Sequence, residues 1–349
     1  MAAVIRIGIM GLCHDHVWSF IAHAAHLADV AIVAAADADE QLRRKATDAG
    51  VSTTFSDPYT MLADTTLDAV AIFGDNRSGP AFGIAAAKRG LHIFVEKPLA
   101  ADYAGAVALY GAAKHAGVVL MVNWPVAWWP SVQHAIALVK RGKIGNLFQV
   151  NYRAAHAGPR ENGCDPQFVE WLYDPYRNGA GVIMDYCCYG AALTCMLLGL
   201  PAKVSTMAGR LRKHDLPAED NAVLIMQHAT ALSTATASWT QIGHMTSYEP
   251  TFYGDKGTLM ASNGKLYFSD AENDRGTVMR VPALSATMQN PVAHFAAVIR
   301  GEVPLIELCN AETALMAQQV LSAGIISVNT GTVVALPLPP AALYDGGLA

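Results

Sequence analysis

The 349-residue sequence is poor in charge, and this shortage excludes several classes of protein. Charged residues make up 15% of the chain and hydrophobic residues 52%, whereas disordered chains combine low hydrophobicity with high charge. The net charge is −5 and the longest basic run is Arg43-Arg44-Lys45, so the basic stripe of a nucleic-acid-binding protein is missing. We expect a folded chain without a nucleic-acid partner, and its length predicts two domains of roughly 150 residues or more.

A long hydrophobic run is also missing. The longest stretch without charge, residues 221–248, is rich in Thr, Ser, Gln and His, and the next apolar stretch, 182–200, contains Asp185. A membrane-spanning helix needs about 20 predominantly apolar residues. A strand-like run begins at Val4, without the basic segment and cleavage site of a signal peptide. We therefore expect a cytoplasmic protein with no membrane partner.

Cysteine is scarce as well, with six residues at positions 13, 164, 187, 188, 195 and 309. They are too few and too scattered for a disulfide framework, and none forms the CxxC pair typical of zinc ligands. His14 and His16 could share a metal ion, but the sequence offers no evident third ligand. We therefore expect reduced thiols and no metal.

The first third of the chain alternates short apolar runs with helical patterns, which predicts parallel βαβ units covered on both faces. The predicted strands are 5–10, 30–35, 69–73, 92–95 and 118–122, and the predicted helices are 16–27, 40–49, 59–62, 79–89 and 101–116. Long strands separated by turn residues follow, which predicts a large, mostly antiparallel sheet. These strands are 147–155, 202–212, 221–227, 231–241, 247–254, 258–262 and 265–269, with helices at 131–141, 180–198, 291–300 and 310–329.

The first predicted strand contains Gly8 and ends in the turn Gly11-Leu12-Cys13-His14-Asp15-His16. In a dinucleotide-binding fold such a turn brings backbone amides and a helix N-terminus to the pyrophosphate. Of the usual GxGxxG pattern only Gly11 is present, because Cys13 and His16 take the other two places. An ordinary strand-to-helix turn is the alternative. We expect Gly8, Gly11, Cys13 and His14 to bind the cofactor.

Asp37 ends the second predicted strand, 26 residues after Gly11. A carboxylate at this point accepts the ribose hydroxyls of an adenosine and repels a 2′-phosphate. The position therefore favours NAD over NADP. The alternative is that Asp37 or Asp39 only caps the next helix.

Two later motifs carry chemistry. Glu96-Lys97-Pro98 follows a strand, which places Lys97 at the carboxyl edge of the sheet, where ligands of open α/β folds bind. Gly179-Ala180-Gly181 opens a helix on which Asp185 and Tyr189 are four residues apart and hence on one face. Together these motifs resemble the Gfo/Idh/MocA oxidoreductases, named after glucose-fructose oxidoreductase and inositol dehydrogenase, over residues 4–338.

The resemblance implies an α/β fold with two domains. The first is an N-terminal Rossmann NAD-binding domain (1–122), and the second is a C-terminal α+β domain (123–349) with a large, mostly antiparallel open sheet that binds substrate and forms oligomers. The chain departs from the family at two places. Tyr189 stands where many members have His, and Ala127 stands where Arg is frequent.

Oxidation of a sugar alcohol removes a hydride from carbon and a proton from oxygen. NAD accepts the hydride, and Lys97 and Tyr189 are the candidate bases. Their ordinary pKa values, about 10.4 and 10, are too high, but burial near a positive nicotinamide would lower that of Lys97. Asp185 would orient the substrate or Lys97. Structural roles, as a core aromatic and a helix-start carboxylate, are the alternatives for Tyr189 and Asp185.

Further candidates lie at strand ends and in the second domain. Asn76, Glu96 and Asn123 each end a predicted strand, where they would contact the ribose and nicotinamide, together with Lys97. Three more candidates would line the substrate pocket with Asp185 and Tyr189: His156, Trp171 and Arg177. Solvent-exposed or core positions are the alternatives.

We therefore expect an NAD-dependent oxidoreductase that acts on a hydroxyl carbon of a cyclic sugar, polyol or sugar derivative. Two other functions stay open: an NAD-retaining glycoside hydrolase or lyase that works by transient oxidation and elimination, and a non-catalytic sugar- or NAD-sensing regulator. The charge-free stretch 221–248 has more apolar surface than one helix layer covers. We expect the outer face of that sheet to form a homodimer or homotetramer.

Overall fold

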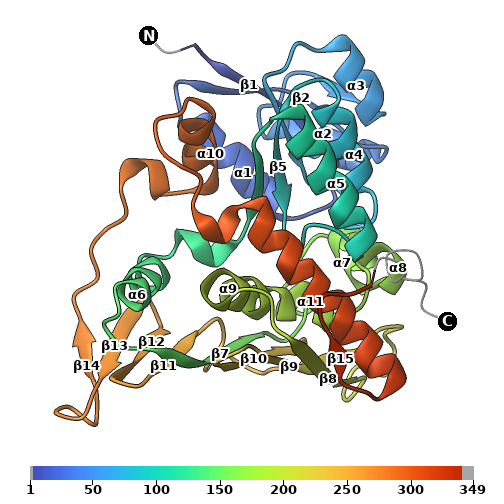
Figure 1. Cartoon of the computed structure of the whole chain (residues 1–349). Helices are drawn as coiled ribbons and strands as arrows, with labels where there is room; N and C mark the ends of the chain where they lie inside the picture. Colours follow the sequence, from blue (N-terminus) through green and yellow to red (C-terminus); the bar gives the residue numbers. More distant parts are fainter. Residues whose placement is uncertain (1–2, 340–349) are drawn as a thin grey trace.

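The structure is a computed structural model that describes residues 3–339. Two sheets lie one above the other, the first near the N-terminus and the second at the bottom of the view (Figure 1). The first has six strands and the second nine. This arrangement confirms the predicted α/β fold, with a parallel sheet followed by a mostly antiparallel one.

The six-stranded sheet has the order β3-β2-β1-β4-β5-β6, and neighbouring strands run parallel. Strands β4 and β6 are buried throughout, as expected when helices cover both faces. The strands are β1 (Ile5–Met10), β2 (Val30–Ala36), β3 (Thr54–Phe55), β4 (Ala69–Ile72), β5 (His92–Glu96) and β6 (Leu120–Asn123). The helices are α1 (His16–Ala25), α2 (Glu40–Asp48), α3 (Pro58–Asp64), α4 (Gly79–Ala87) and α5 (Tyr103–Ala116).

The nine-stranded sheet has the order β14-β13-β12-β11-β7-β10-β9-β8-β15, and only β7 and β10 pair in parallel. Its strands are β7 (Leu147–Ala155), β8 (Lys203–Gly209), β9 (Asn221–Gln227), β10 (Leu232–Ser238), β11 (Thr251–Gly254), β12 (Gly257–Ser262), β13 (Lys265–Ser269), β14 (Thr277–Met279) and β15 (Val334–Ala335). The predicted strand 247–254 begins only at Thr251. Thr246 and Tyr248 have left-handed backbones (φ 58° each), which interrupt extended structure.

The helices of the second half lie on the upper side of this sheet, and α10 reaches up beside α1 (Figure 1). They are η1 (Pro125–Trp128), α6 (Pro130–Lys140), α7 (Pro166–Tyr173), α8 (Pro175–Asn178), η2 (Ile183–Cys187), α9 (Cys188–Leu198), η3 (Ala286–Met288), α10 (Pro291–Ile299), η4 (Glu307–Cys309) and α11 (Ala311–Thr330). Helix α11 contacts α5, α9 and β8, and α10 returns to α1. The domain boundary at residue 122 stays a prediction.

The predicted helix 180–198 is divided into two parts. It begins as the π-helix η2 and continues as the α-helix α9. The start of the segment is held by Glu219, whose carboxylate accepts hydrogen bonds from the amides of Gly181 (2.8 Å) and Ile183 (3.0 Å). Pro175–Leu198 is the one helical segment among residues 3–339 that is long and apolar enough to span a membrane, and 83% of its apolar window is buried in this core.

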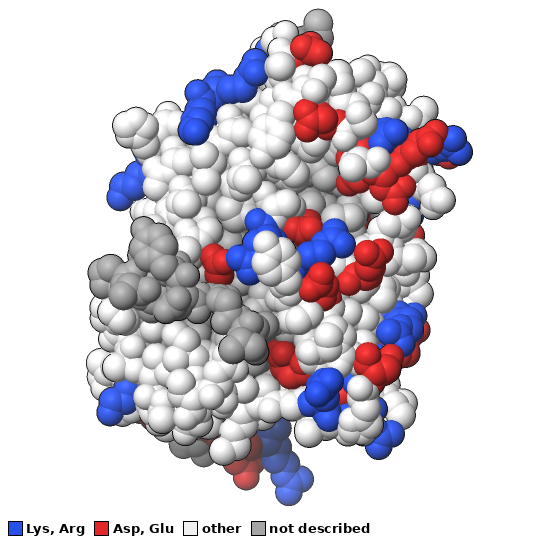
Figure 2. Space-filling model, turned by 90° about the vertical axis from the view of Figure 1, so that its right-hand side faces the viewer, with Lys and Arg blue, Asp and Glu red and all other residues white. Residues whose placement is uncertain are grey.

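Surface charges are mixed. On the face drawn in Figure 2, basic and acidic side chains lie beside one another, and no area of one sign dominates. This mixing agrees with the small net charge of −5.

Candidate active site

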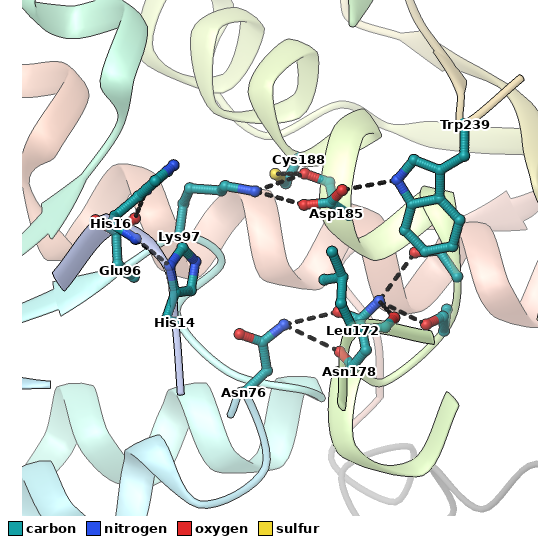
Figure 3. Close-up of polar contacts among 12 residues, drawn as sticks. His14, His16, Asn76, Glu96, Lys97, Leu172, Asn178, Asp185, Cys188 and Trp239 are labelled. Carbon is teal, nitrogen blue, oxygen red and sulfur yellow. Dashed lines mark hydrogen bonds and ion pairs between the residues drawn. The ribbon is translucent and has the colours of Figure 1, made fainter. Parts of the chain in front are cut away.

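A buried ion pair joins the two halves of the protein. Lys97 follows β5 and Asp185 lies in η2, and their side chains point toward each other (Figure 3). Lys97 Nζ donates to Asp185 Oδ1 at 2.6 Å and to the Asp185 carbonyl at 3.1 Å, and both residues are about 4% exposed or less. The strand end and the glycine turn, 88 residues apart, therefore meet at one point.

The carboxylate of Asp185 sets the charge of Lys97. Burial lowers the pKa of Lys97, but the charge of Asp185 and the hydrogen bond to it outweigh burial, so the pKa lies above its usual value. In the protein alone the proton therefore stays on Lys97. The nicotinamide charge considered in the sequence analysis acts in the opposite direction.

Asp185 is itself held from its other side. Trp239 Nε1 donates to Asp185 Oδ2 at 2.9 Å (Figure 3), and Cys188 Sγ donates to the Asp185 carbonyl at 2.9 Å. The π-helix brings Asp185 and its neighbour Tyr186 to the same region, and π-bulges frequently occur at functional sites. Both oxygens of the carboxylate thus have fixed partners.

Aromatic rings surround the ion pair. Lys97 Nζ lies 5.1 Å from the ring centroid of Tyr189 and 5.7 Å from that of Tyr186. His156 contacts Tyr186 edge-on at 4.9 Å, and burial lowers its pKa to about 4. Burial also raises the pKa of Tyr189 well above its usual range, so its hydroxyl is a donor at neutral pH. Of the predicted substrate residues, His156, Asp185 and Tyr189 therefore lie together.

The turn after β1 packs closely against the turn after β4. Gly11 has φ +81°, and a Cβ there would lie 2.5 Å from Gly74 N, so only glycine fits. Asp37 Oδ2 accepts a hydrogen bond from the Leu12 amide at 2.7 Å, which ties the end of β2 to this turn. Asp39, not Asp37, caps α2. Gly8 lies inside β1 and faces Leu67, so its role is packing and not the turn.

A cleft of about 370 Å³, here called the dinucleotide cleft, opens beside this turn. Four carboxylates and one guanidinium line it. The lining residues are Gly11, Cys13, Asp37, Ala38, Asp39, Leu42, Pro58, Gly74, Asp75, Ser78, Phe82, Gln167, Glu170 and Arg177. Arg177 Nε donates to Asp75 Oδ2 at 2.8 Å. The expectation that Arg177 lines the substrate pocket is therefore corrected: it lies in this cleft.

Three residues near the turn after β1 form a cluster: His14, His16 and Glu96 (Figure 3). Each offers one nitrogen or oxygen atom that could bind a metal ion, and these atoms all lie within 4.8 Å of one another. Glu96 Oε1 accepts from Asn123 Nδ2 at 2.6 Å, and Glu96 Oε2 lies 3.2 Å from His16 Nδ1 (Figure 3). His14 Nδ1 accepts from the His16 amide at 3.2 Å, which places the proton of this neutral imidazole on Nε2. Both oxygens of the Glu96 carboxylate therefore have a nitrogen neighbour within this cluster.

Two predicted contacts take structural partners instead. Trp171 is 1% exposed, and its Nε1 donates to the Cys13 carbonyl at 3.0 Å, so it packs on the turn and does not face a sugar. Asn76 Nδ2 donates to Asn178 Oδ1 at 2.8 Å (Figure 3). Asn178 in turn donates to the carbonyls of Leu172 and Ala180.

The sequence analysis missed Trp239, Glu219 and Asn178. Each acts through a contact with a residue far away in the chain, and none belongs to a local motif. A weak signal existed for Glu219 and its neighbour Asp220, because two adjacent carboxylates precede an apolar strand in a chain poor in charge.

Two family models match the chain. One, described as an oxidoreductase family with an NAD-binding Rossmann fold, matches residues 4–124, and the other, the GFO/IDH/MocA C-terminal domain, matches residues 132–260. Together they cover more than half of the sequence. The first match coincides with the six-stranded sheet and its turn after β1.

Similar proteins are known in several organisms. D-xylose 1-dehydrogenase (NADP(+)) 2 of Haloferax volcanii is 31% identical over 56% of this chain and 58% of its own length. D-apiose dehydrogenase of Paraburkholderia graminis is 27% identical over 66% of this chain and 58% of its own length. The match thus spans little more than half of either relative.

The fold is shared with solved structures. An inositol dehydrogenase homolog from Azotobacter vinelandii, complexed with NAD+, superposes with a TM-score of 0.83 at 22% identity, over 96% of this chain and 98% of the other. The fold, the two family models and the Lys97–Asp185 arrangement agree. The chain belongs to the Gfo/Idh/MocA family of oxidoreductases.

Proposed function

We propose that this protein is an NAD-dependent dehydrogenase that acts on a hydroxyl group of a cyclic sugar, polyol or sugar derivative. The observation that carries the proposal is the buried Lys97–Asp185 pair, at 2.6 Å, beside a dinucleotide cleft. A buried charge is costly to maintain, and ionisable groups with shifted pKa values are frequent at catalytic sites. The dehydrogenases that resemble the chain support the same class of substrate.

Lys97 handles the proton in this proposal. Bound NAD accepts or returns a hydride at the substrate carbon. For oxidation the neutral form of Lys97 accepts a hydrogen bond from the substrate hydroxyl and takes its proton. For reduction the charged form donates to the carbonyl oxygen of the substrate and gives that proton back. Asp185 holds Nζ in position, and the Tyr189 hydroxyl offers a second donor to the substrate.

The dinucleotide cleft fits NAD. Gly11 and Asp37 both line it, so the turn that begins at Gly11 would receive the pyrophosphate and the Asp37 carboxylate would accept from the adenosine ribose. The buried Glu96 beside His16 would accept from the second ribose. The excess of carboxylates in the cleft repels a 2′-phosphate. For Asp37→Ser we expect the preference for NAD over NADP to fall about tenfold or more in kcat/KM. A wild-type enzyme that prefers NADP would contradict this assignment.

The test of the dehydrogenase is NADH absorbance with a panel of xylose, glucose, myo-inositol and their glycosides. We expect net NADH formation, and a loss of about 100-fold or more in Lys97→Met with NAD affinity preserved by calorimetry. Release of an aglycone without NADH would instead identify a glycoside hydrolase. Full activity of Lys97→Met would disprove the assigned role.

We also propose a cytoplasmic homo-oligomer. The exposed apolar residues Met207, Val223, Ile225 and Leu232 belong to β8, β9 and β10. The underside of this sheet carries no helix in Figure 1, and these apolar side chains, with the polar Ser205, Gln227 and Thr234 between them, fit a subunit interface.

A further inference from the structure

A second cavity, of about 470 Å³, opens next to the aromatic rings of the candidate active site. This outer pocket lies between the start of α6, the loop 241–250 and the turn between β12 and β13. Its lining residues are Trp129, Pro130, Ser131, Val132, His244, Ser247, Tyr248, Glu249, Ala261, Ser262, Asn263 and Gly264. Its volume falls within the usual range for small-molecule sites.

Tyr248 connects the outer pocket to the ion pair. It lines the pocket, and its ring centroid lies 5.5 Å from that of Tyr189 and 5.7 Å from that of Tyr186. Both tyrosines adjoin Lys97 Nζ. On its other side Tyr248 meets Trp129 edge-on at 6.0 Å. A molecule at Lys97 that extends past Tyr248 would therefore enter the outer pocket.

The walls of the outer pocket suit a neutral sugar. Trp129 is 40% exposed and offers an aromatic face to the C–H side of a ring. Ser131 lines the pocket with its side chain largely buried, and the N-terminus of α6 beside it has no side-chain cap. Glu249, which accepts from Ser262 Oγ at 2.7 Å, supplies acceptors. Sugar hydroxyls need both donors and acceptors.

The charged side chains of the outer pocket and the backbone conformations around it limit the class of ligand that could bind there. No Lys or Arg lines the outer pocket, which disfavours a nucleotide diphosphate. The three non-glycine residues with positive φ in the described chain, Thr246, Tyr248 and Asn263, all line this pocket or lie in its loop. Asn263 belongs to the Asn-Gly turn of the β12–β13 hairpin, where a positive φ is usual. Thr246 and Tyr248 hold the strained kind of conformation that collects at ligand sites.

From these observations we infer that the outer pocket is a second sugar subsite, so that the preferred substrates are disaccharides or glycosides. Their reacting unit would lie at Lys97 and the neighbouring unit on Trp129. The inference rests on the proposed dehydrogenase function and specifies its substrate class. It assigns Trp129 and Ser131 a role in specificity rather than in the chemistry.

The test compares kcat/KM for glucose and xylose with that for cellobiose, maltose, lactose and xylobiose. At least one disaccharide should exceed its monosaccharide about tenfold or more, and Trp129→Ala should reduce this ratio about tenfold. Ser131→Ala should reduce it less. Tyr59→Ala, an exposed aromatic on α3, is the matched control and should leave the ratio unchanged.

Calorimetric titration with the same sugars separates the two proposals. Disaccharide binding that Trp129→Ala weakens supports the subsite even if no NADH forms, in which case the dehydrogenase proposal alone fails. Monosaccharides that are turned over at least as well as every disaccharide, with a ratio that Trp129→Ala leaves unchanged, would overturn the subsite while leaving the dehydrogenase intact.

Discussion

At the scale of single residues, the Lys97–Asp185 pair sets how the reaction should respond to pH. A charged Lys97 cannot accept a proton, and below its raised pKa the neutral fraction grows tenfold with each pH unit. Oxidation should therefore speed up as the pH rises above 7, and reduction should slow down. The protonation state of Lys97 in this ion pair therefore determines whether oxidation or reduction is favoured at a given pH.

Removing the partner carboxylate tests this link. In Asp185→Asn, burial acts on Lys97 without its counter-charge, so its pKa falls. The rising limb of the pH profile for oxidation should shift by about 1–3 units toward lower pH. The shift is measured from kcat/KM between pH 6 and 10. An unshifted profile would show that Lys97 is not the titrating base.

Trp239→Phe is the matched control for that experiment. It removes the 2.9 Å hydrogen bond to Asp185 Oδ2 but keeps the ion pair. We expect a stability loss of about 1–3 kcal/mol by urea unfolding, because a buried carboxylate oxygen loses its donor. The limb of the pH profile should move much less than in Asp185→Asn. An equal shift in both variants would point to a general loss of structure.

The lowered pKa of His156 predicts how the folding stability should depend on pH. Its pKa is about 4 in the folded protein and about 6.5 when unfolded, so between these values only the unfolded chain takes up the proton. Folding stability should therefore fall as the pH drops from 6.5 to 4, by at most about 1.4 kcal/mol per unit from this residue. Urea unfolding of His156→Gln should show a shallower slope. Substitution of the exposed His115 should leave the slope unchanged.

How far the sequence predicted these residues depends on distance along the chain. Lys97, Asp185 and Gly11 were found because each belongs to a short motif whose backbone placement is local. Trp239 and Glu219 were not, because their roles arise only where β9 and β10 pass beneath η2. Arg177 was expected at the substrate pocket and lines the dinucleotide cleft, and Trp171 was expected to face a sugar and packs on the turn after β1. A residue type alone does not say whether its side chain faces a cleft or the core.

At the scale of elements, α7 and α8 connect the second half of the protein to the turn after β1, the proposed dinucleotide-binding turn. Asp165, the residue before α7, accepts from Trp18 Nε1 at 2.9 Å and pairs with Lys45. Trp171 donates to the Cys13 carbonyl, and Arg177 pairs with Asp75. The sequence analysis overlooked both helices, because short helices flanked by Pro166 and Pro175 lack a clear hydrophobic period.

Trp171→Phe tests this attachment. The variant keeps the aromatic contact with His14 but leaves the Cys13 carbonyl without its donor. We expect the Kd for NAD to rise about three- to tenfold, since the turn loses one of its fixed points. Calorimetry measures the Kd. The control is Trp129→Phe, far from this turn, which should bind NAD as the wild type does.

The length and the apolar pattern of an element decide whether the sequence predicts it. Strands β4 and β6 are fully apolar and flanked by turns, so their position was clear from the sequence. The strand β3 was missed because it has only two residues. The π-helix η2 was predicted as α-helix, since hydrophobic spacing does not distinguish one extra residue in a turn.

At the scale of the whole molecule, part of the chain's large apolar content is exposed on one face of the nine-stranded sheet. In β9, exposed and buried residues alternate, so Val223 and Ile225 point away from the core, each 44% exposed. Met207 and Leu232 on the neighbouring strands are 82% and 54% exposed. An apolar surface of this kind across three adjacent strands is uncommon on a monomer.

Ile225→Glu tests whether this face joins subunits. In a closed symmetric assembly each interface would receive the new charge from both subunits, because the same patch meets itself. We expect the wild type to sediment as a dimer or tetramer at micromolar concentration and the variant as a monomer with an unchanged circular dichroism spectrum. Val4→Glu, at an exposed apolar residue before β1, is the control and should keep the wild-type assembly. A monomeric wild type would instead leave the apolar face to contacts with another partner, and the homo-oligomer proposal would be withdrawn.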